Sequence, residues 1–117
     1  MKVYAYANCD TCRKALKHLE KGKHTVEVVP IREQPPTKLE LRAMLKIYEG
    51  KIAKLFNTSG KDYRDMKLGD KLAKMDPEKA LDLLAGNGNL VKRPFVLIGN
   101  TGAVGFRIDE WKLKGLR

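Results

Sequence analysis

Residues 2–31 constrain the fold most, because their pattern predicts a strand, a helix and a second strand in close succession. Residues 2–6 are β-prone and partly alternate between polar and apolar, and residues 25–31 form a second β-prone segment. Between these segments, apolar positions in residues 13–21 recur near helical spacing, and Gly22 is expected to end the helix. Since a strand–helix–strand crossover is right-handed, the two strands should be parallel.

A block of helices is predicted next. Thr37 and Glu40 have the spacing of a capping box, in which each residue satisfies a free backbone amide at a helix start. Asp76 followed by Pro77 predicts another helix start, with an N-cap and a proline in the first turn. Between these two helices, shorter helical pieces are expected around residues 52–56, 63–66 and 71–75.

The last part of the chain predicts a second portion of sheet. Residues 95–98 (Phe-Val-Leu-Ile) are an unbroken apolar strand, as expected for a strand buried on both faces. A turn at 100–102, an antiparallel strand at 103–106 and a helix at 108–113 should follow. The predicted fold class is therefore α/β, with the order β-α-β, a helical insertion, then β-β-α.

The composition predicts one globular domain. The chain has 117 residues, of which 43% are hydrophobic and 32% charged, and no apolar run approaches the ~20 residues of a membrane span. Two cysteines and an N-terminus unlike a secretory signal lead us to expect a cytoplasmic protein, and we expect a monomer. The net charge of +10 favours acidic partners, but the cations are dispersed, so direct nucleic-acid binding is not expected.

Cys9 and Cys12 form a Cys-x-x-Cys motif between the first strand and the first helix. Asp10 or Thr11 is expected to cap that helix. The sulfur of Cys9 should lie near free backbone amides and the positive end of the helix dipole, which stabilise a thiolate. Arg13 adds positive potential nearby. This arrangement predicts a nucleophilic Cys9, with Cys12 placed to resolve a mixed disulfide.

Two other interpretations of the cysteine pair stay open. The cysteines could be half of a zinc site, but the only histidines, His18 and His24, are at no familiar spacing from them. They could also be small apolar residues that fill the core. No metal site is therefore predicted.

Arg93 and Pro94 precede the apolar strand of residues 95–98. A proline at that place suggests a cis peptide bond in a tight turn, which in a thioredoxin-like layout lies beside the cysteine turn. Arg93 would then point near Cys9. Arg107 follows the last strand, and its planar guanidinium suits an oxyanion, although a solvated arginine is the simpler interpretation.

Several motifs in order resemble the ArsC family, and the resemblance covers nearly the whole chain. They are residues 8–16 (Asn-Cys-Asp-Thr-Cys-Arg-Lys-Ala-Leu), Pro35-Pro36, Lys92-Arg93-Pro94 and residues 104–107 (Val-Gly-Phe-Arg). That family includes glutaredoxin-dependent arsenate reductases, Spx-type transcriptional regulators and YffB-like proteins. The resemblance implies a thioredoxin-like fold with a four-stranded mixed sheet. Its core would span about residues 1–31 and 90–117, with a helical insertion at about 32–89.

The resemblance also implies roles for single residues. Cys9 matches the nucleophile of the arsenate reductases, and the turn that includes Arg13 matches their anion-binding turn. Arg93 and, more roughly, Arg107 match the arginines that hold the oxyanion. The loop at 57–61 has no third arginine, so Lys61 is the expected substitute, although it lacks the bidentate fork.

Cys12 separates the branches of the family. Glutaredoxin-dependent reductases tend to have serine there, because glutathione attacks next, whereas in Spx-like proteins such a pair is a redox switch. Our first hypothesis is a thiol oxidoreductase that acts on an oxyanion or on a glutathione or protein disulfide. It binds no cofactor and works with glutathione, glutaredoxin or thioredoxin. The alternative is a regulator that binds the RNA polymerase α subunit according to the state of a Cys9–Cys12 disulfide.

Overall fold

The computed structural model describes all 117 residues, which form two compact units. One unit comprises Met1–Pro30 and Arg93–Arg117, and the other comprises Ile31–Lys92. The second unit starts one residue before and ends three residues after the helical insertion that the sequence predicts. None of the helices is long and apolar enough to cross a membrane.

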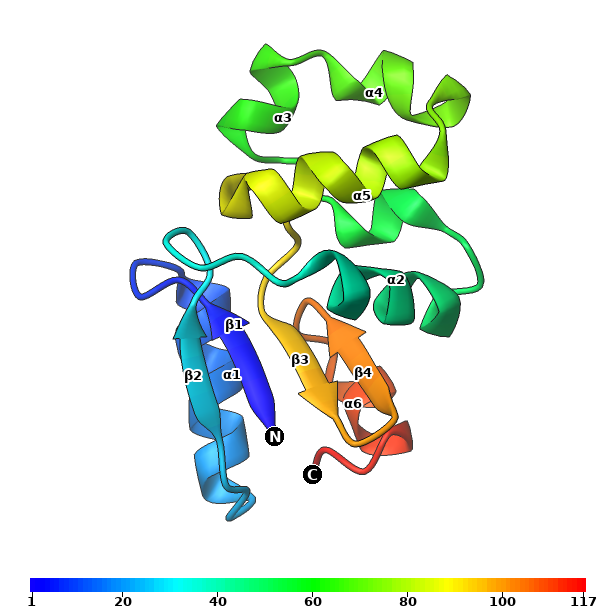
Figure 1. The fold of residues 1–117 in the computed structure, drawn as a ribbon. Coiled ribbons are helices and arrows are strands. Elements are labelled where there is room, and N and C mark those ends of the chain that lie inside the picture. The colour runs from blue at the N-terminus through cyan, green and yellow to red at the C-terminus, as the bar shows by residue number, and fades with distance from the viewer. The chain divides into compact units, whose positions relative to one another are not determined.

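The first unit is a four-stranded mixed sheet with two helices (Figure 1). Its elements are β1 (Lys2–Ala5), α1 (Asp10–Lys21), β2 (Glu27–Pro30), β3 (Phe95–Ile98), β4 (Thr101–Val104) and α6 (Ile108–Leu113). The strand order is β2-β1-β3-β4, with β1 parallel to β2 and antiparallel to β3, and with β4 antiparallel to β3. The predicted thioredoxin-like α/β layout is thus confirmed, including the parallel first pair and the central place of β3.

The core of this unit lies between one face of the sheet and helices α1 and α6. Alternate strand residues point into it, which is the period expected of a strand with one face on this core. The buried cluster comprises Val3, Ala5, Cys12, Ala15, Leu19, Val96, Ala103, Trp111 and Leu116. Trp111 is fully buried, and its indole N–H donates to the carbonyl of Gly105 at 3.1 Å, so it anchors α6 on the sheet.

The hairpin between β3 and β4 differs from the prediction. The turn falls at Gly99 and Asn100 rather than at 100–102, and β4 spans Thr101–Val104 rather than 103–106. Gly99 has a φ of +53°, a left-handed conformation that costs glycine little. The chain therefore reverses earlier than the sequence suggests, and Ile98 pairs with Thr101.

The second unit is helical. Its elements are α2 (Lys38–Ile47), η1 (Ile52–Leu55), α3 (Lys61–Asp65), α4 (Leu68–Lys71), η2 (Leu72–Lys74), α5 (Pro77–Gly86) and η3 (Gly88–Leu90). The capping box is present, since Glu40 N donates to Thr37 Oγ1 at 3.1 Å and Thr37 N donates to Glu40 Oε1 at 2.9 Å. Asp76 caps α5 with Pro77 in the first turn. Both predicted helix starts are confirmed.

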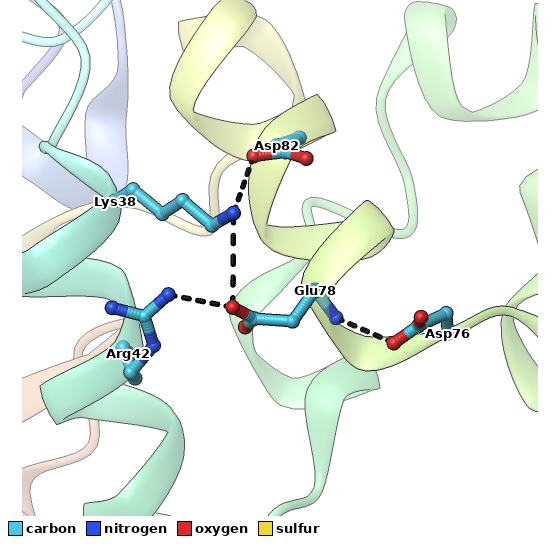
Figure 2. A network of polar contacts seen from close by, with 5 residues as sticks. All are labelled: Lys38, Arg42, Asp76, Glu78 and Asp82. Carbon is cyan, nitrogen blue, oxygen red and sulfur yellow. Dashed lines mark hydrogen bonds and ion pairs between the residues drawn. The ribbon is translucent and has the colours of Figure 1, made fainter.

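Ion pairs link α2 to α5 in this unit (Figure 2). Lys38 Nζ lies 2.8 Å from Asp82 Oδ1, and Arg42 Nη2 lies 2.7 Å from Glu78 Oε1. These side chains are at least a third exposed, so each pair contributes at most about 1 kcal/mol. Burial of the apolar faces of the two helices is therefore the larger contribution to their packing.

Gly88 lies where the backbone of the second unit makes a close approach to itself. A Cβ at Gly88 would lie 1.8 Å from the carbonyl oxygen of Ile31 and 3.0 Å from Arg32 Cα. Both neighbours are backbone atoms, which cannot rotate away. By contrast, a Cβ at Gly86, the last residue of α5, would meet nothing within 4 Å.

We predict opposite effects of alanine at these two glycines. Gly88→Ala should lower the free energy of unfolding by about 1–3 kcal/mol, because the backbone must shift to admit the methyl group. Gly86→Ala, the matched control, should be neutral or stabilise by up to about 1 kcal/mol, since alanine is a better helix former. Urea unfolding of both variants is the measurement, and equal midpoints for the two would contradict this account.

Candidate active site

Cys9 is the N-cap of helix α1, so its sulfur replaces the oxygen that usually accepts hydrogen bonds at that position. The Cys12 amide donates to Cys9 Sγ over 3.4 Å, and the Arg13 amide donates to the Cys9 carbonyl at 3.0 Å. The cap is thus Cys9 itself, not Asp10 or Thr11 as expected from the sequence. A sulfur in this place faces free amides and the positive end of a helix of 12 residues.

The surroundings of Cys9 favour its thiolate. Partial burial opposes ionisation, but it is outweighed by the backbone amide of Cys12, the thiol of Cys12 and the positive charge of Arg93, which together lower the pKa of Cys9. The side chain is half-buried and packs against the edge of the core while staying accessible. Cys9 is therefore an accessible thiol with the lowered pKa that a nucleophile needs.

Cys12 has the opposite environment. It lies in the core at 1% exposure, and burial raises its pKa to about 12, with a further increase from the neighbouring Cys9. Hydrogen bonding by the Tyr6 backbone only partly offsets this rise. Both cysteines are free thiols in this structure. The pair therefore consists of one group set up to ionise and one that keeps its proton.

Arg93 lies beside the cysteine turn. The Arg93–Pro94 peptide bond is cis, and Pro94 is buried at the start of β3. The Arg93 guanidinium contributes directly to the lowered pKa of Cys9. Its Nη1 is buried and has no hydrogen-bond partner in the protein, so this donor is available to an acceptor on a ligand.

Arg13 does not point at the sulfur of Cys9. Its guanidinium is paired with the carboxylate of Asp10 and donates through Nη1 to the carbonyl of Ala7 at 2.8 Å. Both contacts lie at the exposed rim of the turn. Arg13 thus stabilises the loop that precedes α1, and its charge is compensated by Asp10, so it is a poor candidate for binding an anion.

The other two predicted cations also lie apart from the cysteine pair or have partners of their own. Lys61 belongs to the second unit and forms an ion pair with Asp65 at 2.7 Å. Arg107 is the exposed N-cap residue of α6 and lines a surface pocket of about 490 Å³ together with Ile108 and Leu113. No hydrogen bond or ion pair joins Arg107 to the cysteine turn. Among the predicted cations of the first unit, Arg93 is the one that acts on Cys9.

Tyr6 is a further neighbour of the site, although its sequence position indicates only a place in the first strand. The strand β1 ends at Ala5, and the Tyr6 carbonyl instead accepts the Cys9 amide at 3.2 Å. Its ring lies beneath the Arg93 guanidinium, with Cζ 5.2 Å from the ring centroid. No spacing rule indicates this contact, because Tyr6 and Arg93 are far apart in the sequence.

We predict that Cys9 is alkylated faster than a free thiol at neutral pH. Because its pKa is lowered, the thiolate fraction should rise with pH at values where an ordinary cysteine is still protonated. The measurement is the pH dependence of iodoacetamide alkylation in the Cys12→Ser variant, which leaves one thiol.

The matched controls for this prediction are two arginine substitutions. Arg93→Gln should move the inflection of the alkylation profile to higher pH, since a positive charge beside the thiolate is lost. Arg13→Gln should move it much less, because Arg13 is already paired with Asp10. An unchanged profile in Arg93→Gln would contradict the assignment of Arg93 to the site.

The ArsC family model matches residues 4–113 of the chain. An uncharacterized protein from Bacillus subtilis (strain 168), YusI, is 42% identical over 96% of this chain and 95% of its own length. The global transcriptional regulator Spx of Streptococcus agalactiae serotype V is 28% identical over 92% of this chain and 77% of its own.

A solved structure agrees with these matches. The crystal structure described as a possible arsenate reductase from Streptococcus mutans UA159 has a TM-score of 0.85 and 34% identity. The likeness covers 91% of this chain and 90% of that one. It extends over both units, the sheet that carries the cysteine pair and the helical unit. These similarities support a thiol-redox function, and the chain belongs to the ArsC family.

Proposed function

We propose that this protein is a thiol–disulfide oxidoreductase in which Cys9 is the nucleophile and Cys12 the resolving thiol. The observation that carries the proposal is the environment of the Cys9 sulfur, which caps α1, accepts from the Cys12 amide and lies next to Arg93. Attack on a disulfide requires a thiolate, and this environment supplies one.

The first step joins the Cys9 sulfur to one sulfur of a glutathione or protein disulfide. The substrate's S–S bond breaks, and its other half leaves as a thiolate that takes a proton from solvent. The free donor on Arg93 Nη1 can hold negative charge on the incoming substrate. The product of this step is a mixed disulfide on Cys9.

The second step uses Cys12. Part of the rise in its pKa comes from the neighbouring Cys9, and this part is lost when Cys9 is bound in a mixed disulfide. The Cys12 thiol then gives up its proton, its sulfur attacks the Cys9 sulfur, and the second half of the substrate leaves. The substrate gains two electrons and the protein is left with a Cys9–Cys12 disulfide. Glutathione, glutaredoxin or thioredoxin reduces this disulfide again.

A disulfide suits this site better than an oxyanion. An arsenate dianion needs several strong donors around it, and the resemblance to the arsenate reductases offered Arg13, Lys61, Arg93 and Arg107 for that role. Arg13 and Lys61 are each paired with a carboxylate of their own, and Arg107 has no bond to the cysteine turn. Arg93 is left as the available arginine, and its single positive charge matches the single negative charge of the thiolate that leaves a disulfide.

We predict that the wild type reduces a glutathionylated peptide in the presence of glutathione and glutaredoxin or thioredoxin. Cys9→Ser should abolish turnover, because no thiolate remains to attack. Arg93→Gln should lower kcat/KM by about tenfold, the effect of losing one charged hydrogen bond. When the reductants are left out, Cys12→Ser should accumulate the Cys9 mixed disulfide, which intact-mass spectrometry detects.

A parallel assay uses arsenate as the substrate with the same reductants. Reduction of arsenate at a higher kcat/KM than the peptide disulfide would contradict the choice of substrate. Absence of turnover with both substrates would contradict the enzymatic proposal.

The second candidate is a redox-dependent regulator, favoured by Cys12 and by the similarity to Spx. In that role the dithiol and disulfide forms of the Cys9–Cys12 pair would differ in affinity for the RNA polymerase α subunit. The prediction is that purified α subunit binds one redox form at least tenfold more tightly, a difference of about 1.4 kcal/mol. Calorimetry with Cys9→Ser as the control measures it, and equal affinities would eliminate the candidate.

A further inference from the structure

Tyr6 contacts the site in two separable ways. Through its backbone it accepts the Cys9 amide at 3.2 Å and hydrogen-bonds at Cys12. Through its side chain it lies under the Arg93 guanidinium, 5.2 Å from ring centroid to Cζ. Because the backbone contacts do not depend on the ring, a side-chain substitution at Tyr6 leaves them in place, and a comparison with phenylalanine separates the ring from the hydroxyl group.

Arg93 is held differently from other arginines in the chain. The guanidinium groups of Arg13 and Arg42 are paired with the carboxylates of Asp10 and Glu78. A carboxylate of this kind neutralises the cation and occupies its N–H groups. Arg93 has no carboxylate partner and is held by the face of an aromatic ring.

An aromatic ring attracts a cation without neutralising it. The attraction comes from the negative face of the ring, and the guanidinium keeps its full charge while its N–H groups, at its edge, stay unused. Such a contact is consistent with the state of Arg93 Nη1, which is buried and has no hydrogen-bond partner. It also keeps a long, flexible side chain in one place beside the sulfur.

We propose that Tyr6 is a positioning residue whose ring holds the Arg93 guanidinium beside the Cys9 sulfur, with its charge uncompensated by a carboxylate and its Nη1 donor free. The inference rests on the proposed function, since it gives Arg93 the task of supporting the Cys9 thiolate and the incoming substrate. Tyr6 does not touch the reacting atoms with its side chain; it acts through Arg93.

The experiment compares Tyr6→Leu with Tyr6→Phe in the Cys12→Ser background. Tyr6→Leu removes the ring, so iodoacetamide alkylation of Cys9 at neutral pH should slow by about two- to fivefold, the worth of one partly exposed cation–π contact. The inflection of its pH profile should move to higher pH. Tyr6→Phe keeps the ring and should follow the wild-type profile.

A second cation–π pair supplies the matched control. Lys54 Nζ lies 5.9 Å from the centroid of the Tyr48 ring, in the other unit. Tyr48→Leu should leave the alkylation profile of Cys9 unchanged. Thermal unfolding of all three variants shows that each is folded at the temperature of the assay.

A double-mutant cycle shows whether the effect passes through Arg93. In an Arg93→Gln background, Tyr6→Leu should produce no further slowing, because the cation that the ring holds is absent. With the Cys12 thiol present, kcat/KM for a glutathionylated peptide should fall by the same two- to fivefold in Tyr6→Leu and recover in Tyr6→Phe.

Three results would overturn the inference: an unchanged profile in Tyr6→Leu, a Tyr6→Phe variant as slow as Tyr6→Leu, or additive effects of the Tyr6 and Arg93 substitutions. Each leaves the proposed function intact when the wild type shows a reactive Cys9 thiolate and turns over the peptide disulfide. A wild type without that thiolate would instead refute the proposed function itself.

Discussion

The hydrogen bond from the Cys12 amide to the Cys9 sulfur starts helix α1 and stabilises negative charge on that sulfur. A thiolate is a better acceptor than a thiol, so ionisation of Cys9 and a firm start of the helix favour each other. The free N-terminal amides of α1 cannot serve this purpose in the unfolded chain. The reactivity of Cys9 is thus a property of the folded first unit.

The two cysteines differ in burial because Cys12 lies on the inner face of helix α1, whereas Cys9 lies at the start of that helix. Cys12 lies on the face of α1 that carries Ala15 and Leu19, and this face is packed into the core. Cys9 precedes the first helical turn and stays accessible. Positive charge is used just as selectively: the chain carries a net charge of +10, yet Arg93 is the arginine that acts on the sulfur.

Local patterns in the sequence were enough for most of the fold. The capping box at Thr37 depends only on neighbouring residues, so spacing predicted it correctly. The crossover rule likewise predicted the parallel pairing of β1 and β2. The β3–β4 turn was misplaced because a left-handed Gly99 depends on the strand pairing around it, which the local pattern does not specify. The cap of α1 was assigned to Asp10 or Thr11 because cap preferences favour oxygen, and sulfur is a rare acceptor there.

Strand and helix periodicities and the Cys-x-x-Cys motif are all local features, so they suffice to place the cysteine pair between a strand and a helix. Which charges act on the pair depends instead on the folding of distant segments against one another. Arg93 reaches Cys9 because β3 lies beside β1 in the sheet, and this same pairing sets the Tyr6 ring beneath its guanidinium. Arg13, four residues from Cys9, is turned to Asp10 instead. Proximity in sequence predicted the wrong arginine, since electrostatic effects depend on distance in space.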